Sequence, residues 1–187
     1  MRLFLGIEIP KKIQTDLFEL LIDLRKQYPQ FSWILPDRYH IAIYHFGETT
    51  KKKELIDRCS QLFFDQYEFS LHARSLQVFD SKTSLSLFVD FFREKQLEQI
   101  AFIINEDLGI SRNKTEYSPH ISIAKSRRSS KQQYFVLQKI LSKSSVLFSV
   151  PVRQLVIMKE DQLEEGKGYN IVGKIPLIKK KRKEVEI

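Results

Sequence analysis

Cysteine is nearly absent from the sequence: among its 187 residues there is one, Cys59. A single cysteine cannot form an intramolecular disulfide, which excludes the disulfide-rich secreted domains. No apolar run is long enough for a membrane-spanning helix, and the apolar start of the chain is interrupted at Glu8 and Pro10, too early for a signal peptide. We therefore expect a cytoplasmic protein with no membrane partner.

Metal-ligand spacings and linker segments are missing as well. The four histidines and one cysteine form no His-x-x-x-His or Cys pair, so we expect neither a metal nor a cofactor. No low-complexity stretch divides the chain. We expect one domain over residues 1–178, a monomer, with a basic tail over residues 179–187.

Positive charge is in excess. The formal net charge is +8 and the sequence pI is about 9.5. A basic surface favours phosphate-bearing partners, nucleic acid first, although many proteins of other function are also basic. For the tail, a solvated and frayed terminus is the simplest interpretation.

Hydrophobic residues make up 42% of the chain, enough for a sizeable core. Their periodicity predicts strand, helix, strand, helix, strand, and then the same order again. The first copy covers about residues 2–80 and the second about 84–158, with a last strand near residues 169–178. If two such lobes face each other, their equivalent strands lie on opposite walls of one cleft.

Two histidines occupy equivalent positions in the copies. His40 heads "HIAI" and His120 heads "HISI", each on the middle strand of its copy. Alternation along a strand puts His40, Ala42 and Tyr44 on one face and the isoleucines on the other. The same rule places Ser122 beside His120, where its hydroxyl can donate a hydrogen bond to a phosphoryl oxygen.

Two imidazoles across a cleft suit acid–base chemistry, because one can accept a proton while the other donates one. In-line displacement at phosphorus needs such a pair. A lone strand histidine is usually a surface or core residue, but two in equivalent positions favour function. His45, predicted to lie on the isoleucine face, and His72 are interpreted as structural.

The two motifs resemble those of the 2H phosphoesterases. "WILPDRYHIAIYHFGE" and "YSPHISIAK" are similar to stretches of the LigT-like RNA 2′,3′-cyclic phosphodiesterases, also known as 2′-5′ RNA ligases. The opening "MRLFLGIEIP" and closing "GKGYNIVGKIPL" resemble that branch too. The aligned motif positions are Trp33, His40, Gly47, Pro119, His120, Ser122 and Lys125.

The resemblance implies a two-lobed α+β fold, with antiparallel sheets facing a central cleft. It also implies metal-independent hydrolysis of a terminal 2′,3′-cyclic phosphate to a 2′-phosphomonoester, with reversible 2′-5′ ligation as a further activity. In that reaction His40 would protonate the leaving 3′ oxygen and His120 would activate water. The partners would be RNA ends or nucleotides that carry a cyclic phosphate.

Three positions depart from the family pattern. Ala42 replaces the first threonine and removes one hydrogen bond to phosphate, whereas Ser122 keeps the hydroxyl of the second. Lys125 replaces an arginine as a phosphate-binding residue, and strict alternation would turn it toward the isoleucine face.

Trp33 and Tyr44 are candidate platforms on which a terminal base could stack. Phe79 is a third candidate, for which core packing is the favoured interpretation.

Two other functions stay open. One is a 2H phosphodiesterase that acts on a small nucleotide cyclic phosphate. The other is a catalytically weak RNA-binding protein, which Ala42 and the positive charge suggest.

Overall fold

The structure is a computed structural model that describes residues 1–81, 83–108, 117–127, 131–163 and 166–179. Residues 180–187 of the predicted basic tail lie outside this range. The strands are β1 (Arg2–Glu8), β2 (Ser32–Trp33), β3 (His40–Glu48), β4 (Phe69–Asp80), β5 (Ser84–Phe91), β6 (His120–Arg127), β7 (Ser149–Val152), β8 (Gln154–Leu163) and β9 (Gly166–Pro176). The helices are α1 (Lys11–Leu20), α2 (Ile22–Gln27), the 3₁₀ helix η1 (Pro36–Arg38), α3 (Lys52–Leu62), α4 (Lys95–Asp107) and α5 (Lys131–Leu141).

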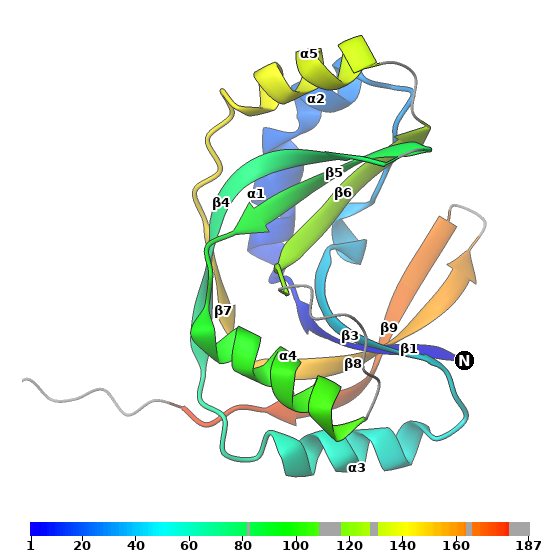
Figure 1. The fold of residues 1–187 in the computed structure, drawn as a ribbon, viewed down its shortest axis with the longest axis vertical. Coiled ribbons are helices and arrows are strands. Elements are labelled where there is room, and N and C mark those ends of the chain that lie inside the picture. The colour runs from blue at the N-terminus through cyan, green and yellow to red at the C-terminus, as the bar shows by residue number, and fades with distance from the viewer. Residues whose placement is uncertain (82, 109–116, 128–130, 164–165, 180–187) are drawn as a thin grey trace, which may run out of the picture.

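The strands of the described residues form one nine-stranded antiparallel sheet with the order β7-β4-β5-β6-β3-β1-β8-β9, and β2 pairs with β6. Figure 1 shows that the sheet divides into two halves. We call β3, β1, β8 and β9 the His40 half, and β4, β5 and β6 the His120 half. The one pair that joins β3 to β6 in the described residues is Ile41–Ile121. The predicted α+β class is confirmed.

Each sequence copy gives its third strand to the other half. β4, which ends the first copy, pairs with β5, and β8, which ends the second, pairs with β1. The halves therefore match strand for strand: β3-β1-β8 corresponds to β6-β5-β4. The sequence repeat predicted two similar lobes, but the exchange depends on long-range pairing that periodicity does not encode.

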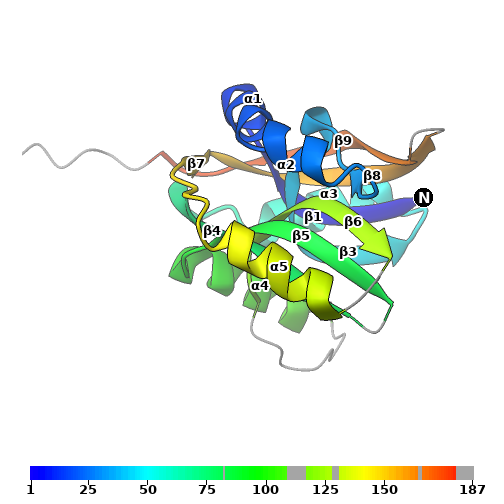
Figure 2. The ribbon, with the colours of Figure 1, turned by 90° about the horizontal axis from the view of Figure 1, so that it is seen from above.

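Helices cover one face of each half. α3 and α4 lie below the His40 half in Figure 1, whereas α5 and α2 lie above the His120 half. The view from above shows α5 across β4 and β5, with α1 and α2 beside them (Figure 2). Residues of both halves and of these helices form one main core, including Leu5, Ile41, Cys59, Leu87, Ile100 and Leu137. Cys59 is buried there, as its helical spacing predicted.

One helix was predicted between Pro10 and Pro29, and two are observed. Pro10 precedes α1, where a missing N–H costs nothing. The helix is interrupted at Leu21, which is fully buried, and α2 continues to Gln27. The last strand of the second copy is also divided, at Arg153, into β7 and β8. Hydrophobic spacing carries no signal for either interruption.

Candidate active site

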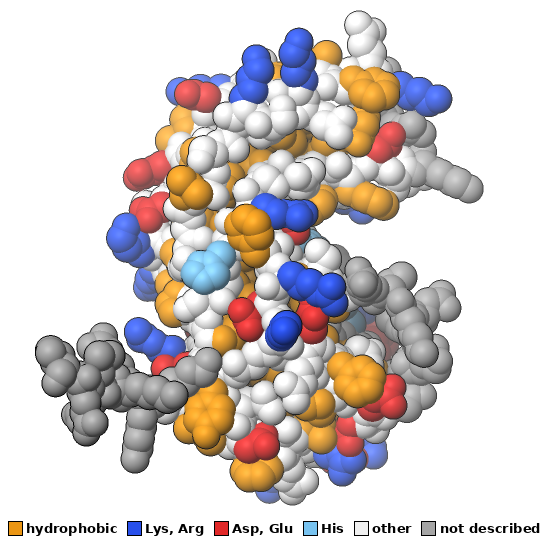
Figure 3. Space-filling model, turned by 60° about the vertical axis from the view of Figure 1, so that its left-hand side comes forward, with side chains coloured by type: hydrophobic (Ala, Val, Ile, Leu, Met, Phe, Trp, Pro, Cys, Tyr) orange, Lys and Arg blue, Asp and Glu red, His pale blue; other side chains and the backbone are white. Residues whose placement is uncertain are grey.

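The two motif histidines lie on either side of the junction between the halves. His40 and His120 each directly precede an isoleucine of the Ile41–Ile121 pair. Both isoleucines are 0% exposed and face the main core. Because neighbours along a strand point to opposite faces, both imidazoles lie on the other face of the sheet, which we call the histidine face. Figure 3 shows the molecule hollowed between its two halves.

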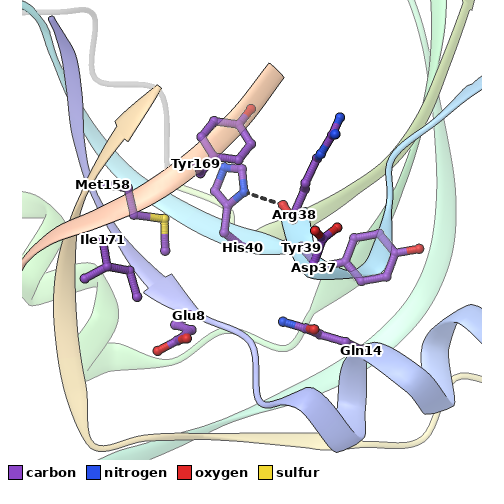
Figure 4. Close-up of a pocket in the computed structure, with 9 residues that line it drawn as sticks. All are labelled: Glu8, Gln14, Asp37, Arg38, Tyr39, His40, Met158, Tyr169 and Ile171. Carbon is purple, nitrogen blue, oxygen red and sulfur yellow. Dashed lines mark hydrogen bonds between the residues drawn. The ribbon is translucent and has the colours of Figure 1, made fainter. Parts of the chain in front are cut away.

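Both imidazoles are held in the same tautomer. His40 Nδ1 lies 2.9 Å from the carbonyl oxygen of Arg38, and His120 Nδ1 lies 3.1 Å from that of Ser118 (His40 in Figure 4). A carbonyl oxygen can only accept, so Nδ1 carries the hydrogen in each ring. The Nε2 atom of each neutral ring is left with a lone pair for proton transfer.

The surroundings of the two histidines differ. The His40 ring lies 5.0 Å from that of Phe4 and 4.3 Å from that of Tyr169, whereas His120 is exposed and lies 5.5 Å from Phe88. Burial lowers the pKa of His40 below its ordinary value, and the positive charges of His45 and His120 lower it further, against the opposing hydrogen bond to Arg38.

A small cavity of about 80 Å³ lies against His40. Its lining is drawn in Figure 4 and comprises Glu8, Gln14, Asp37, Arg38, Tyr39, His40, Met158, Tyr169 and Ile171. Ligand pockets for drug-sized molecules are usually about 300–1,000 Å³. The cavity is too small for a nucleotide, and a ligand of that size would have to extend from it into the open hollow between the halves.

The alternation of both histidine strands is broken by a β-bulge. Along β1, Gly6 pairs with Ala42 and Leu5 with Tyr44, so Ile43 is an extra residue. Along β5, Phe88 pairs with Ser122 and Leu87 with Ala124, so Ile123 is extra. The extra isoleucine is the third residue after the histidine in both strands. Beyond each bulge the side chains change faces.

The bulge in β3 makes the prediction for Tyr44 and His45 wrong. Tyr44 does not share the face of His40: it is 6% exposed and packs in the main core, where it cannot stack on a base. His45 is exposed, and its ring lies 5.4 Å from Phe4, the same ring that contacts His40. A third imidazole therefore lies near the candidate site.

The bulge in β6 has the opposite consequence for Lys125. Ala124 is buried, and Lys125 is exposed and opposite Ser86. Lys125 thereby returns to the histidine face, where strict alternation would not place it. Ser122 precedes the bulge and is exposed on that face, as predicted.

Trp33 lies on the other side of the sheet. It pairs with Ala124, which is buried in the main core, and its indole N–H donates to the Tyr28 carbonyl at 3.0 Å. The Arg25 guanidinium lies 5.2 Å from its ring. These contacts support core packing instead of the base stacking considered for Trp33. Phe79 shows the reverse: core packing was favoured for it, but it is exposed.

Two residues of the site were missed at the sequence level. The Tyr117 hydroxyl donates to the Ala42 carbonyl at 2.8 Å, which ties the segment before β6 to β3, and burial raises the pKa of this phenol. Asp90 is buried opposite His120, forms an ion pair with Arg74 and accepts a 2.9 Å hydrogen bond from its neighbour's backbone N–H. A tyrosine three residues before a histidine is no recognisable motif, and only the β5–β6 register reveals Asp90.

In the described part of the chain, no three His, Cys, Asp or Glu side chains group as a metal site would need. No described helix is both long and apolar enough to cross a membrane.

Residues 16–164 match the model of the 2′-5′ RNA ligase superfamily, and this match covers most of the chain. The chain belongs to the 2′-5′ RNA ligase superfamily. An RNA 2′,3′-cyclic phosphodiesterase of Geobacillus stearothermophilus is 20% identical over an alignment of 181 residues that covers 94% of this chain and 57% of that relative. The chain thus spans little more than half the length of the curated relative.

Several solved structures share the fold. The crystal structure of TT0787 of Thermus thermophilus has a TM-score of 0.73 at 18% identity and covers 97% of this chain and 100% of its own. That of Escherichia coli LigT complexed with 3′-AMP has a TM-score of 0.69 at 16% identity and covers 94% and 97%. The LigT-like resemblance of the two histidine motifs is confirmed at the level of family and fold, and the family is one of phosphoesterases.

Proposed function

We propose that this 2′-5′ RNA ligase superfamily member hydrolyses the 2′,3′-cyclic phosphate at an RNA end to a 2′-phosphomonoester. The observation that carries the proposal is the placement of His40 and His120 on either side of the Ile41–Ile121 pair, each with Nδ1 hydrogen-bonded to a carbonyl. The two free Nε2 atoms share the histidine face, as in-line displacement at one phosphorus requires.

In the proposed reaction, water attacks phosphorus and the bond from phosphorus to the 3′ oxygen breaks. His120, which is exposed, takes the proton of the water, and His40 gives a proton to the 3′ oxygen. The products are a 2′-phosphate and a free 3′-hydroxyl. The reverse step, from a 2′-phosphate back to the cyclic form, exchanges the two roles.

The donor role of His40 depends on the substrate. Burial lowers its pKa in the free protein, which favours the neutral ring. A bound phosphodiester brings a negative charge next to the ring, and an opposite charge stabilises the protonated form. Substrate binding therefore supplies the proton donor at His40.

In the proposed reaction, two residues of the His120 half stabilise the negative charge on the phosphoryl oxygens. The Ser122 hydroxyl and the Lys125 ammonium group are exposed on the histidine face. Hydrogen-bond donors and cations held where charge develops stabilise the transition state. Since the chain supplies an acid, a base and these groups, the proposed reaction uses no metal ion, and we expect activity to persist in EDTA.

The comparisons support the substrate class without deciding it. A distant relative is named an RNA 2′,3′-cyclic phosphodiesterase, and E. coli LigT has been solved with 3′-AMP. The first acts on an RNA end and the second binds a nucleotide, so both relatives handle nucleotide phosphates. Reversible 2′-5′ ligation is a further activity that the superfamily name suggests, and it needs a separate assay with a 5′-hydroxyl acceptor strand.

The test uses the purified full chain and a short RNA with a 2′,3′-cyclic phosphate. We expect conversion to the 2′-phosphate, identified by chromatography against 2′- and 3′-phosphate standards. His40→Ala and His120→Ala should lose the activity. His72→Ala should keep it, because His72 lies away from the site, where its Nδ1 forms a 2.7 Å hydrogen bond with the Ser149 hydroxyl. Unchanged substrate with the wild-type protein would overturn the proposal.

One observation favours a second candidate, an RNA-binding protein with weak catalysis. Ala42 supplies no hydroxyl to match that of Ser122, and it packs against Phe4 and Met158 in a small apolar cluster. If the wild-type protein leaves cyclic-phosphate RNA and mononucleotides intact but retards RNA on a gel, this function is favoured. If mononucleotides alone react, a small-nucleotide phosphodiesterase is favoured.

A further inference from the structure

The histidine face continues across three strands of the His120 half. Directly opposite residues in an antiparallel ladder point to the same face, so the pairing of β4 with β5 and of β5 with β6 extends that face in rows. The rows are Ser75–Asp90–His120, Gln77–Phe88–Ser122 and Phe79–Ser86–Lys125, followed by the pair Ser84–Arg127. The residues between them, such as Leu76, Val78, Leu85 and Leu87, are buried in the main core.

Two aromatic rings stand on this otherwise polar face. Phe88 lies next to His120, and Phe79 stands two strands and two rows away, where it is 62% exposed. With a rise of about 3.3 Å per residue and about 4.8 Å between strands, Phe79 lies roughly 16 Å from His120 along the sheet. By the same geometry, Phe88 lies only about half as far from His120 as Phe79 does.

Cations are located along the same rows. Lys125 shares the row of Phe79, and Arg127 is exposed one row further from His120. Aromatic platforms combined with a basic track are how proteins hold single-stranded nucleic acid, since every base has a face that can stack and every nucleotide carries a phosphate. A nucleotide at His120 reaches Phe88, so a base on Phe79 has to belong to an upstream nucleotide.

We propose that the β4–β5–β6 face binds the RNA strand upstream of the cyclic phosphate, with Phe79 stacking an upstream base and Arg127 contacting a phosphodiester. This rests on the proposed function and narrows its substrate to oligoribonucleotide ends instead of mononucleotides. The cyclic phosphate lies at the histidine pair, and the strand leads away along the rows toward the β4–β5 turn.

The experiment compares uridine 2′,3′-cyclic phosphate with a tetraribonucleotide that ends in the same group. Phe79→Ala should raise the KM of the tetranucleotide about fivefold or more, because one stacked base contributes about 1–3 kcal/mol. Its kcat and the KM of the mononucleotide should not change. Phe79→Trp should restore the low KM, which a loss of packing alone would not predict.

Phe135→Ala is the matched control. Phe135 is also 62% exposed, but it belongs to α5, on the other side of the sheet. It should leave both KM values unchanged. Equal KM increases for both substrates in Phe79→Ala, or an equal effect of Phe135→Ala, would overturn the inference.

The two proposals fail in different ways. A wild-type protein that hydrolyses the mononucleotide as efficiently as the tetranucleotide keeps the proposed function and contradicts the upstream site. A protein that hydrolyses neither contradicts the proposed function. Fluorescence anisotropy with a 5′-labelled RNA then tests the face directly, and equal dissociation constants for wild type and Phe79→Ala contradict it.

Discussion

The two halves of the sheet use the same backbone plan but surround their histidines differently. Each has a bulge three residues after the histidine and an Nδ1 contact to the carbonyl two residues before it. His40 is enclosed by Phe4 and Tyr169, whereas His120 is open to solvent. The same backbone arrangement thus positions the two imidazoles, and the side chains around them leave one enclosed and the other exposed to solvent.

The residues at one pair of equivalent positions also differ. Gly6 in the His40 half corresponds to Phe88 in the other, because they pair with Ala42 and Ser122. A Cβ at Gly6 would come within 2.6 Å of the Ile41 carbonyl oxygen, so no side chain fits there. The His40 half therefore has no aromatic platform at this position.

The largest expected effect comes from removing either histidine. His40→Ala and His120→Ala should each lower kcat about 10²- to 10⁴-fold, the usual contribution of a general acid or base. If the two act on one phosphorus, the double variant should be little slower than either single variant, because groups that act as a unit are not additive. Single-turnover rates measure this, and multiplied losses would indicate two independent sites.

Exchanging the hydroxyl between the halves is the next test. Ser122→Ala should lower kcat about ten- to hundredfold, because a hydrogen bond to a charged group contributes about 1.5–3 kcal/mol. Ala42→Ser, which makes the His40 half resemble the other, should raise it. An unchanged rate in Ser122→Ala would show that this hydroxyl does not reach the phosphate.

The link between the halves can be weakened at Tyr117. Tyr117→Phe removes the hydrogen bond to the Ala42 carbonyl. Loss of a buried partner costs about 1–3 kcal/mol, so we expect the free energy of unfolding in urea to fall by that amount. Tyr67→Phe is the control, since Tyr67 is exposed. Equal stabilities of the two variants would exclude Tyr117 as a tie between the halves.

The smallest effect concerns His45. Its positive charge is one cause of the lowered pKa of His40. Replacing it in His45→Gln makes protonation of His40 easier, so the NMR titration midpoint of His40 should move to higher pH. His72→Gln should not move the midpoint. A shift to lower pH in His45→Gln would mean that the two rings do not interact as described.

The parts of this account that sequence could predict are those carried by local pattern. Alternation and helical spacing located the histidine strands, and the repeat of "HIAI" and "HISI" paired them. The faces of Tyr44, His45 and Lys125 could not be read locally, because a bulge is defined by the register of the partner strand. The same holds for Asp90 and Phe79, whose neighbours come from strands pairing across the sheet.

The most direct test of the central claim is an NMR titration of ¹⁵N-histidine-labelled protein with adenosine 2′-monophosphate, the type of product proposed. If His40 and His120 meet over one phosphate, their Nε2 resonances will shift together with a single dissociation constant, and those of His72 will stay unchanged. Response of only one of the two rings, or two different dissociation constants, would contradict a shared site.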